Sequence, residues 1–220
     1  MKVRYISQAW LVILLSLSFA GALAGVDVWL APRIEANKLA ATIDKIPILV
    51  PGADKADSSK YEIVPVTVGE GKFKTTYEAF WATDNKGKPL GWVIKASGQG
   101  FADKIELLIG VDSQVATITG LRVLSQKETP GLGNKIEDVG SADKPAFLMQ
   151  FEKGIKADKP VGAIKETPVP GSNKIKAVTG ATISSTAICT IVNEALTPQL
   201  RSALVKALKD GPKLRQKAKE

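Results

Sequence analysis

The amino-acid sequence predicts an α+β fold: an antiparallel sheet packed with helices, preceded by one N-terminal transmembrane helix. Three observations support this prediction. An uncharged run lies near the start of the chain, strand-like segments separated by turn residues occupy its middle, and helix-like repeats of apolar residues close it. The 220 residues, of which 45% are hydrophobic, suffice for one globular domain with a core and an appendage.

The N-terminal run spans residues 9–26, AWLVILLSLSFAGALAGV, and follows the basic residues Lys2 and Arg4. At about 1.5 Å per residue it fits a short transmembrane helix, and its basic flank places the N-terminus in the cytoplasm. A cleaved signal peptide is the alternative, because AGALAG offers the small residues of a cleavage site. We favour the uncleaved anchor, since the run is longer than a usual signal core and Trp29 lies where an interfacial aromatic residue belongs. The prediction is a single-pass protein of the inner (cytoplasmic) membrane with its domain on the periplasmic side.

Four regions are predicted along the chain. They are a cytoplasmic tip and transmembrane anchor (1–30), a stalk and linker (31–64), the main domain (65–200), and a C-terminal helix with a basic tail (201–220). Within the second region, RIEANKLAATIDK (33–45) predicts a short helix that ends before two prolines.

The middle of the chain has the pattern of an antiparallel meander. In residues 74–98, two apolar runs flank DNKGK, where Asn and Gly tolerate the backbone angles of a hairpin turn. A second pair of runs, 104–112 and 115–125, follows with a polar turn between them. Their β-branched and aromatic residues favour strands over helices, so we predict at least four strands.

Two amphipathic helices are predicted at the end. In the first, the apolar residues recur every 3.6 positions up to Pro198 and should pack on the sheet: Ile183, Ala187, Ile188, Ile191, Val192, Ala195 and Leu196. The second, PQLRSALVKALKDG, is predicted to stop at Gly211-Pro212.

Composition excludes several kinds of site. The chain has no histidine and one cysteine, so it contains no Ser/His or Cys/His nucleophile pair, His-ligated zinc, c-type haem motif or Cys-ligated iron–sulfur cluster. We therefore expect no catalytic residue and no metal site. The net charge of +8 would suit nucleic acid, but the lysines are scattered singly and the only dense basic run is 212–220. Nucleic-acid binding is not expected.

One stretch, KAVTGATISSTAIC (176–189), places five hydroxyl side chains around Gly180, at the start of the first of the two predicted C-terminal helices. A helix N-terminus attracts anions such as phosphate, and glycine lets the backbone approach them closely. The alternative is that Thr179 or Thr182 is a plain helix N-cap. The stretch is neither a Walker A loop nor a GxGxxG fingerprint.

VTGATISS (178–185) resembles the flavinylation motif of FMN-binding domains, which occur in the G subunit of the Rnf electron-transport complex and the C subunit of the sodium-pumping NADH:quinone oxidoreductase. The resemblance implies that Thr182 carries FMN through a phosphodiester bond. It also implies a phosphate cradle made by Thr179, Gly180, Ala181, Ser184 and Ser185.

KETPGLGNKIE (127–137) is similar to the loop that lies near the flavin in the same family. Without the family, Pro130-Gly131 predicts only a turn. The resemblance implies that the loop forms a wall near the flavin ring, through Glu128, Thr129, Gly131, Leu132 and Gly133. A third segment, GQGFADKIELLIGVD (98–112), resembles the glycine-containing approach to the family's central strands.

The resemblance spans residues 65–200 and implies an exported, membrane-anchored flavoprotein subunit that relays electrons within an ion-translocating oxidoreductase complex of the Rnf type. Its partners are the other membrane subunits, and a separate flavin transferase attaches the FMN. Alternatives are a flavin domain of another exported reductase system, or a membrane-tethered binding or scaffold domain that has lost the flavin.

Two residues depart from the family's pattern. Lys176 stands where the family usually has Asp, and its side chain either pairs with the phosphate or faces solvent. Ala102 stands where some relatives carry an aromatic residue, so stacking on the flavin there is weaker or comes from another side chain.

Overall fold

The computed structural model describes residues 2–53, 61–69, 74–84, 86, 88–138 and 146–217. The chain divides into two compact units, Met1–Ala41 and Thr42–Glu220. Each unit is described by itself.

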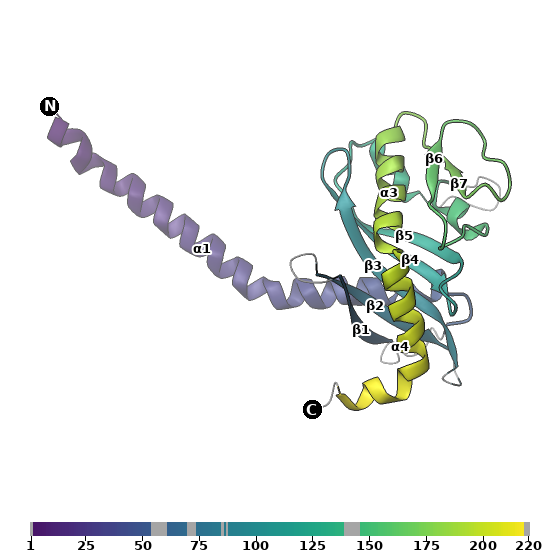
Figure 1. Ribbon diagram of the computed structural model, residues 1–220. Helices are drawn as coiled ribbons and strands as arrows, with labels where there is room; N and C mark the ends of the chain where they lie inside the picture. Colours follow the sequence, from purple (N-terminus) through teal and green to yellow (C-terminus); the bar gives the residue numbers. More distant parts are fainter. Residues whose placement is uncertain are drawn as a thin grey trace. The chain divides into compact units, whose positions relative to one another are not determined.

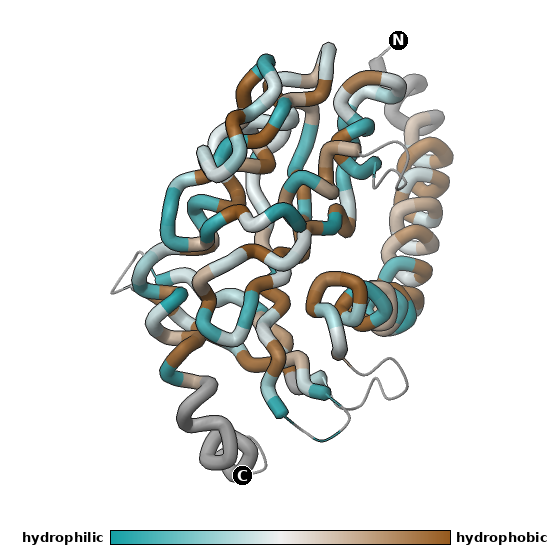
Figure 2. Tube along the Cα trace, turned by 90° about the vertical axis from the view of Figure 1, so that its right-hand side faces the viewer, coloured by the Kyte–Doolittle hydropathy of each residue, from teal (hydrophilic) through white to brown (hydrophobic). Residues whose placement is uncertain are grey.

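The first unit consists almost entirely of one helix, α1 (Lys2–Ile43), which contains Pro32. An 18-residue window within it has a mean hydropathy of 2.1 and no buried residue, so its length and composition suit a membrane span; Figure 2 colours much of this helix as hydrophobic. The separate short helix predicted at 33–45 is wrong, because α1 continues without a break through Pro32. Residues of high helix propensity, such as Ala and Leu, flank the proline on both sides.

The second unit is built on a five-stranded antiparallel sheet of order β1-β2-β3-β4-β5 (Figure 1). The strands are β1 (Glu62–Val68), β2 (Thr75–Thr83), β3 (Pro89–Gln99), β4 (Lys104–Asp112) and β5 (Ile118–Ser125). The predicted meander is confirmed. The additional strand, β1, lies at the edge of the sheet, where its Pro65 is tolerated.

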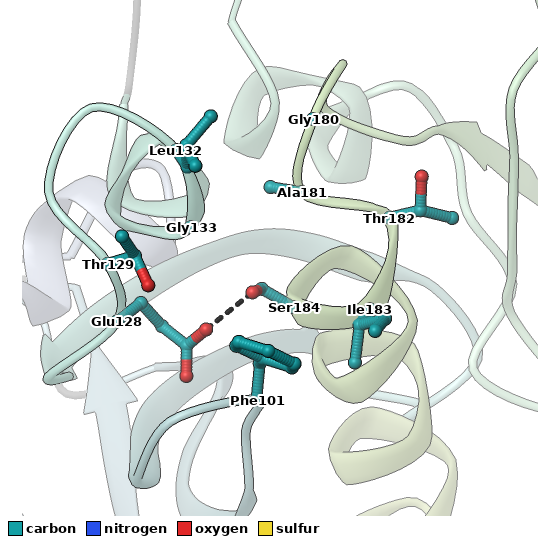
Figure 3. Close-up of a pocket in the computed structure, with 10 residues that line it drawn as sticks. All are labelled: Phe101, Glu128, Thr129, Leu132, Gly133, Gly180, Ala181, Thr182, Ile183 and Ser184. Carbon is teal, nitrogen blue, oxygen red and sulfur yellow. Dashed lines mark hydrogen bonds between the residues drawn. The ribbon is translucent and has the colours of Figure 1, made fainter.

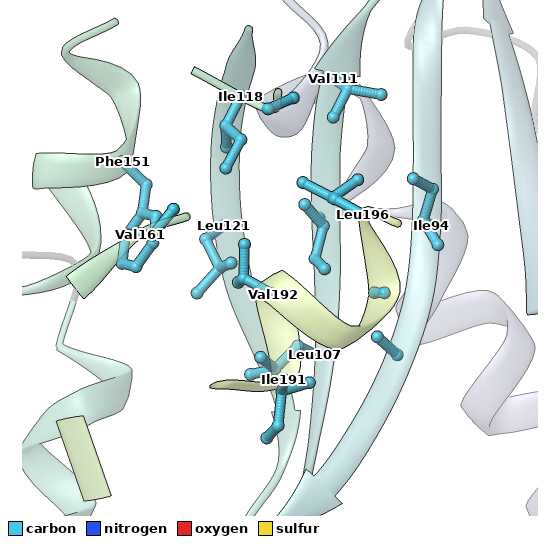
Figure 4. Packing of buried hydrophobic residues seen from close by; sticks show 14 of the residues in the cluster. Ile94, Leu107, Val111, Ile118, Leu121, Phe151, Val161, Ile191, Val192 and Leu196 are labelled. Carbon is cyan, nitrogen blue, oxygen red and sulfur yellow. The ribbon is translucent and has the colours of Figure 1, made fainter. Parts of the chain in front are cut away.

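Both faces of the sheet are buried, and successive side chains of a strand point to opposite faces. On one face, Trp92 and Ile94 of β3 join the main core beneath α3 (Thr182–Ala195) and α4 (Pro198–Lys217), part of which Figure 4 shows. On the other face, Val93 packs with a short helix, α2 (Ile46–Leu49).

Residues 46–53 contribute to this second face, although they belong to the region predicted as stalk and linker. Ile46 and Leu49 are fully buried, and Val50 is 2% exposed. Three residues of the run IPILV therefore belong to the core, whereas its Ile48 is exposed.

The two C-terminal helices are confirmed with two differences. Ile188, Ile191 and Val192 of α3 are buried against the sheet, whereas Ile183 in its first turn is 59% exposed. Helix α4 continues past the predicted stop at Gly211-Pro212 to Lys217, since Lys, Leu, Arg and Gln after the proline favour helix.

Short elements join the sheet to α3. After β5, a loop leads into the 3-10 helix η3 (Gly133–Glu137), and a second 3-10 helix, η4 (Leu148–Glu152), follows. The parallel pair β6 (Gly162–Ile164) and β7 (Lys174–Lys176) then leads into the turn before α3. The loop before η3 and the turn before α3 carry the two motifs singled out in the sequence.

Candidate functional site

The turn before α3 leads into the helix without a side-chain cap. Gly180 has φ +82°, a left-handed conformation that glycine adopts without strain. Ala181 is the N-cap residue and no side chain caps the helix, so Thr182 is its first residue. The alternative that Thr179 or Thr182 is a plain N-cap is therefore wrong. The uncapped first turn can offer its N–H groups to an anion.

Three hydroxyl side chains near this turn are hydrogen-bonded inside the protein. The Ser184 hydroxyl donates to a carboxylate oxygen of Glu128 at 2.5 Å. The hydroxyls of Ser185 and Thr186 each donate to the main-chain oxygen four residues earlier, at 2.9 Å. Ser185 also accepts a hydrogen bond from the Val178 N–H at 3.0 Å. These three side chains hold the start of the helix together.

Thr179 and Thr182 are different. Within the described part of the chain, neither hydroxyl makes a hydrogen bond. Thr179 is exposed and lies outside the cavity beside the turn, whereas Thr182 is half-buried and lines that cavity. Of the two threonines, Thr182 is thus the one that lines the cavity and also has an unpaired hydroxyl.

The cavity has a volume of about 320 Å³ and lies between the start of α3 and the loop before η3 (Figure 3). It is lined by Phe101, Glu128, Thr129, Leu132, Gly133, Gly180, Ala181, Thr182, Ile183 and Ser184. The two sequence motifs, some fifty residues apart, therefore form opposite walls of one site. Among the predicted site residues, Thr179, Gly131 and Ser185 do not line it.

Two lining residues were not predicted from the sequence, Phe101 and Ile183. Phe101 is 61% exposed and Ile183 is 59% exposed, and with Leu132 at 48% they give the cavity an apolar rim. Phe101 adjoins Ala102, so the aromatic side chain in this part of the site comes from the preceding residue. Its position in GQGF was the available indication in the sequence. Exposed apolar and aromatic side chains around a concave site are typical of small-molecule pockets.

Glu128 lies at the base of the cavity and is only 4% exposed. One carboxylate oxygen accepts from Ser184, and the other accepts from the Ala102 N–H at 3.0 Å. The side chain is packed closely between Gly100 and Gly133, where an added Cβ would collide with it. Both glycines therefore allow the carboxylate to be buried here.

Exposed charges surround this region. Asp103 lies beside the Gly100 turn, and the hydrogen bond from the Lys104 N–H, helped by the nearby Lys127 ammonium, lowers the pKa of its carboxyl. Lys127 Nζ is 3.6 Å from the Asp103 carboxylate, in an exposed pair of small energetic weight. The positive end of the α3 dipole also faces the cavity.

Lys176 does not reach this site. It lies in β7 and is exposed, and its main-chain N–H and C=O bond to the Gln150 side chain at 2.7 and 3.0 Å. Its side chain borders a separate hollow with Gln150 and Pro168. Of the two alternatives considered for Lys176, the structure supports exposure to solvent.

Comparison with known proteins finds related sequences. Residues 100–197 match the FMN-binding domain family. The chain is 30% identical over 162 residues to the G subunit of the Na(+)-translocating ferredoxin:NAD(+) oxidoreductase complex of Acetobacterium woodii, covering 72% of this chain and 73% of that protein. It is 35% identical over 113 residues to the G subunit of the ion-translocating oxidoreductase complex of Methanosarcina acetivorans, covering 51% of this chain and 53% of that protein. In this second alignment the chain spans about half the length of its relative.

Solved structures with a similar fold include Shewanella oneidensis NqrC, with a TM-score of 0.54 and 20% identity over 66% of this chain and 69% of that one. Another is the C subunit of the Na(+)-translocating NADH-quinone reductase of Parabacteroides distasonis, with a TM-score of 0.53 and 22% identity over 80% of this chain and 95% of that one. At these identities the likeness concerns the fold.

Proposed function

This chain belongs to the family of G subunits of ion-translocating oxidoreductase complexes, and on that premise we propose that it is an exported, membrane-anchored flavoprotein subunit. It relays electrons through FMN bound covalently to Thr182, within a complex of the Rnf type. Its partners are the other membrane subunits of that complex.

The observation that carries this proposal is the state of the Thr182 hydroxyl. Thr182 lines the cavity and its hydroxyl has no hydrogen-bond partner among the described residues, whereas the hydroxyls of Ser184, Ser185 and Thr186 bond to partners inside the protein. A hydroxyl that must become an ester has to be free and accessible. Thr182 meets both conditions, and Thr179 meets them only outside the cavity.

The residues around Thr182 fit an FMN group. A phosphate on Thr182 would be held at the uncapped N-terminus of α3, where the positive φ of Gly180 would let the backbone approach it. The apolar rim formed by Phe101, Leu132 and Ile183 suits a planar aromatic ring. These residues hold and orient the cofactor, and the cofactor, when bound, supplies the capacity to accept and donate electrons.

The lack of histidine is consistent with attachment by another protein. No base within this chain needs to activate Thr182, because a separate flavin transferase carries out the transfer. In such a transfer Thr182 Oγ would accept the FMN phosphate from FAD, AMP would be the leaving group, and the transferase would take the hydroxyl proton. The chain has only to present the oxygen and retain the product.

Helix α1 anchors the domain in the inner membrane. Lys2 and Arg4 favour a cytoplasmic N-terminus, so the FMN-binding domain lies on the periplasmic side. A protease added to spheroplasts should then degrade the domain while the spheroplasts remain intact. Protection of the domain until the membrane is opened would contradict this orientation.

Covalent attachment is tested by co-expressing the chain with a flavin transferase and examining denaturing gels under ultraviolet light. The parent and Thr179→Ala should retain a fluorescent band after denaturation, and Thr182→Ala should not. A known FMN-binding domain, expressed with the same transferase, controls for its activity. A dark parent beside a fluorescent control would overturn the proposal in favour of a domain that has lost the flavin.

A further inference from the structure

Glu128 joins three segments that are distant in sequence. Its own loop follows β5, one carboxylate oxygen accepts from the Ala102 N–H in the turn before β4, and the other accepts from Ser184 in the first turn of α3. Phe101 is next to Ala102 in the sequence, Thr182 lies two residues before Ser184, and both Phe101 and Thr182 line the cavity. The carboxylate therefore fixes the spacing between them.

Both oxygens of Glu128 act as hydrogen-bond acceptors. Among the described residues, no Lys or Arg lies within ion-pair distance of it; the nearby Lys127 is paired with Asp103. The side chain is 96% buried by area, since only 4% is exposed. A charge in such a place is weakly screened by water.

The packing around the carboxylate prevents it from moving away. A Cβ added at Gly133 would lie 2.9 Å from Glu128 Oε2 and 3.0 Å from Ser184 Oγ. Gly100 closes the other side in the same way. The charge is thus held at a defined place at the base of the cavity.

We infer that Glu128 is a positioning residue whose carboxylate locks the three walls of the cavity together and keeps a negative charge beside the bound flavin, which lowers the flavin's reduction potential. The inference rests on the proposed function, because it concerns FMN held in this cavity. A fixed negative charge opposes the addition of electrons to an acceptor nearby. Hydrogen bonds to Ser184 and Ala102 place that charge, so Glu128 acts without needing to bond the flavin itself.

The test compares three variants of the full chain loaded with FMN by a flavin transferase. Glu128→Gln removes the charge and nearly keeps the shape, Ser184→Ala removes one hydrogen bond and keeps the charge, and Glu78→Gln removes a carboxylate from the exposed pair with Lys95 on β2. Spectroscopic redox titration measures the midpoint potential of each. We expect a higher potential in Glu128→Gln, a smaller change in Ser184→Ala, and the parent value in Glu78→Gln. Equal potentials in Glu128→Gln and Glu78→Gln would overturn the inference.

Hydrogen exchange of the chain without flavin tests the locking role separately. In Ser184→Ala the amides of residue 102 and of the first turn of α3 should exchange faster than in the parent, and in Glu78→Gln they should not. Unchanged exchange in Ser184→Ala would overturn the locking role even if Glu128→Gln failed to fold. A parent that never acquires flavin would instead contradict the proposed function. The exchange result would still test whether Glu128 holds Ser184 and Ala102 together.

Discussion

Gly133 shows how closely single residues of the site are fitted. The space in which its Cβ would lie is occupied by Glu128 and Ser184, at distances of 2.8 to 3.0 Å. Both neighbours are buried, so neither can turn away into solvent. The glycine is therefore required by packing, although its loop is exposed on either side.

Gly133→Ala should destabilise the domain by about 1–3 kcal/mol, because the added methyl group overpacks a buried hydrogen bond. Gly162→Ala is the matched control, since the nearest atom to its added Cβ is 4.0 Å away. Urea denaturation followed by tryptophan fluorescence measures both. A free energy of unfolding for Gly133→Ala equal to that of Gly162→Ala would contradict the packing described above.

Cys189 gives a pH-dependent prediction. Burial raises the pKa of its thiol to about 12 from an ordinary value of about 9. Between these values the unfolded chain loses the thiol proton while the folded chain keeps it, so the free energy of unfolding falls as the pH rises. This fall should be steeper in the parent than in Cys189→Ala, and urea denaturation at a series of pH values from about 8 to about 11 measures the difference. The same dependence of the free energy of unfolding on pH in the parent and in Cys189→Ala would show that the thiol is not buried as described.

At the scale of elements, α3 both borders the cavity and packs on the sheet. Its first turn presents Thr182 and Ile183 to the cavity, and the rest of its length packs on β3, where Ile191 lies against Gly98. A Cβ at Gly98 would approach the Ile191 side chain to 2.6 Å, so the helix lies very close to this strand. The close contact with the sheet fixes the position of the end that carries Thr182.

Ile191→Ala should cost about 2–5 kcal/mol of stability, the range found when a buried isoleucine is truncated. Ile183→Ala is the natural comparison, because it lies in the same helix and is 59% exposed. It should change stability by no more than about 0.5 kcal/mol. Similar losses in the two variants, measured by chemical denaturation, would mean that α3 is not seated on the sheet in this way.

At the scale of the whole molecule, the domain begins earlier than the sequence pattern indicates. Ile46 and Leu49 fill the face of the sheet opposite α3 and α4. A chain that starts at Thr42 should fold cooperatively. A chain that also lacks residues 42–53 should lose at least about 3 kcal/mol, the value for exposing two of the large apolar side chains of the sheet that this segment covers. Denaturation of the two chains decides this. Equal stability would assign residues 42–53 to the linker.

Local patterns predicted much of this fold. Apolar runs separated by turn residues in 74–98 and 104–125 predicted four of the five strands, and the spacing of Ile188, Ile191 and Val192 predicted the buried face of α3. The continuity of α1 through Pro32 was not predicted, because the helix propensity of the residues on both sides overrides the local effect of proline. The burial of Ile46 was not predicted, because it depends on packing against the sheet.

The site was only partly predictable for a similar reason. Both motifs are visible in the sequence, and the family resemblance implied that they lie near one flavin, but the residue pattern by itself does not place them across one cavity. Phe101 enters the site because β3 and β4 bring its turn to the same end of the sheet, and the hydrogen bond between Glu128 and Ser184 joins residues 56 positions apart. Such long-range contacts appear only when the sheet is assembled.

The most direct test of the central claim is to locate the attached flavin by mass spectrometry. Trypsin releases residues 177–201 as one peptide, since the sequence has no Lys or Arg between Lys176 and Arg201. After co-expression with a flavin transferase, this peptide should gain the mass of FMN less one water, and fragmentation should place the gain on Thr182. A modification on Thr179 or on another residue, or a peptide of unmodified mass from a chain that was exposed to an active transferase, would contradict the account.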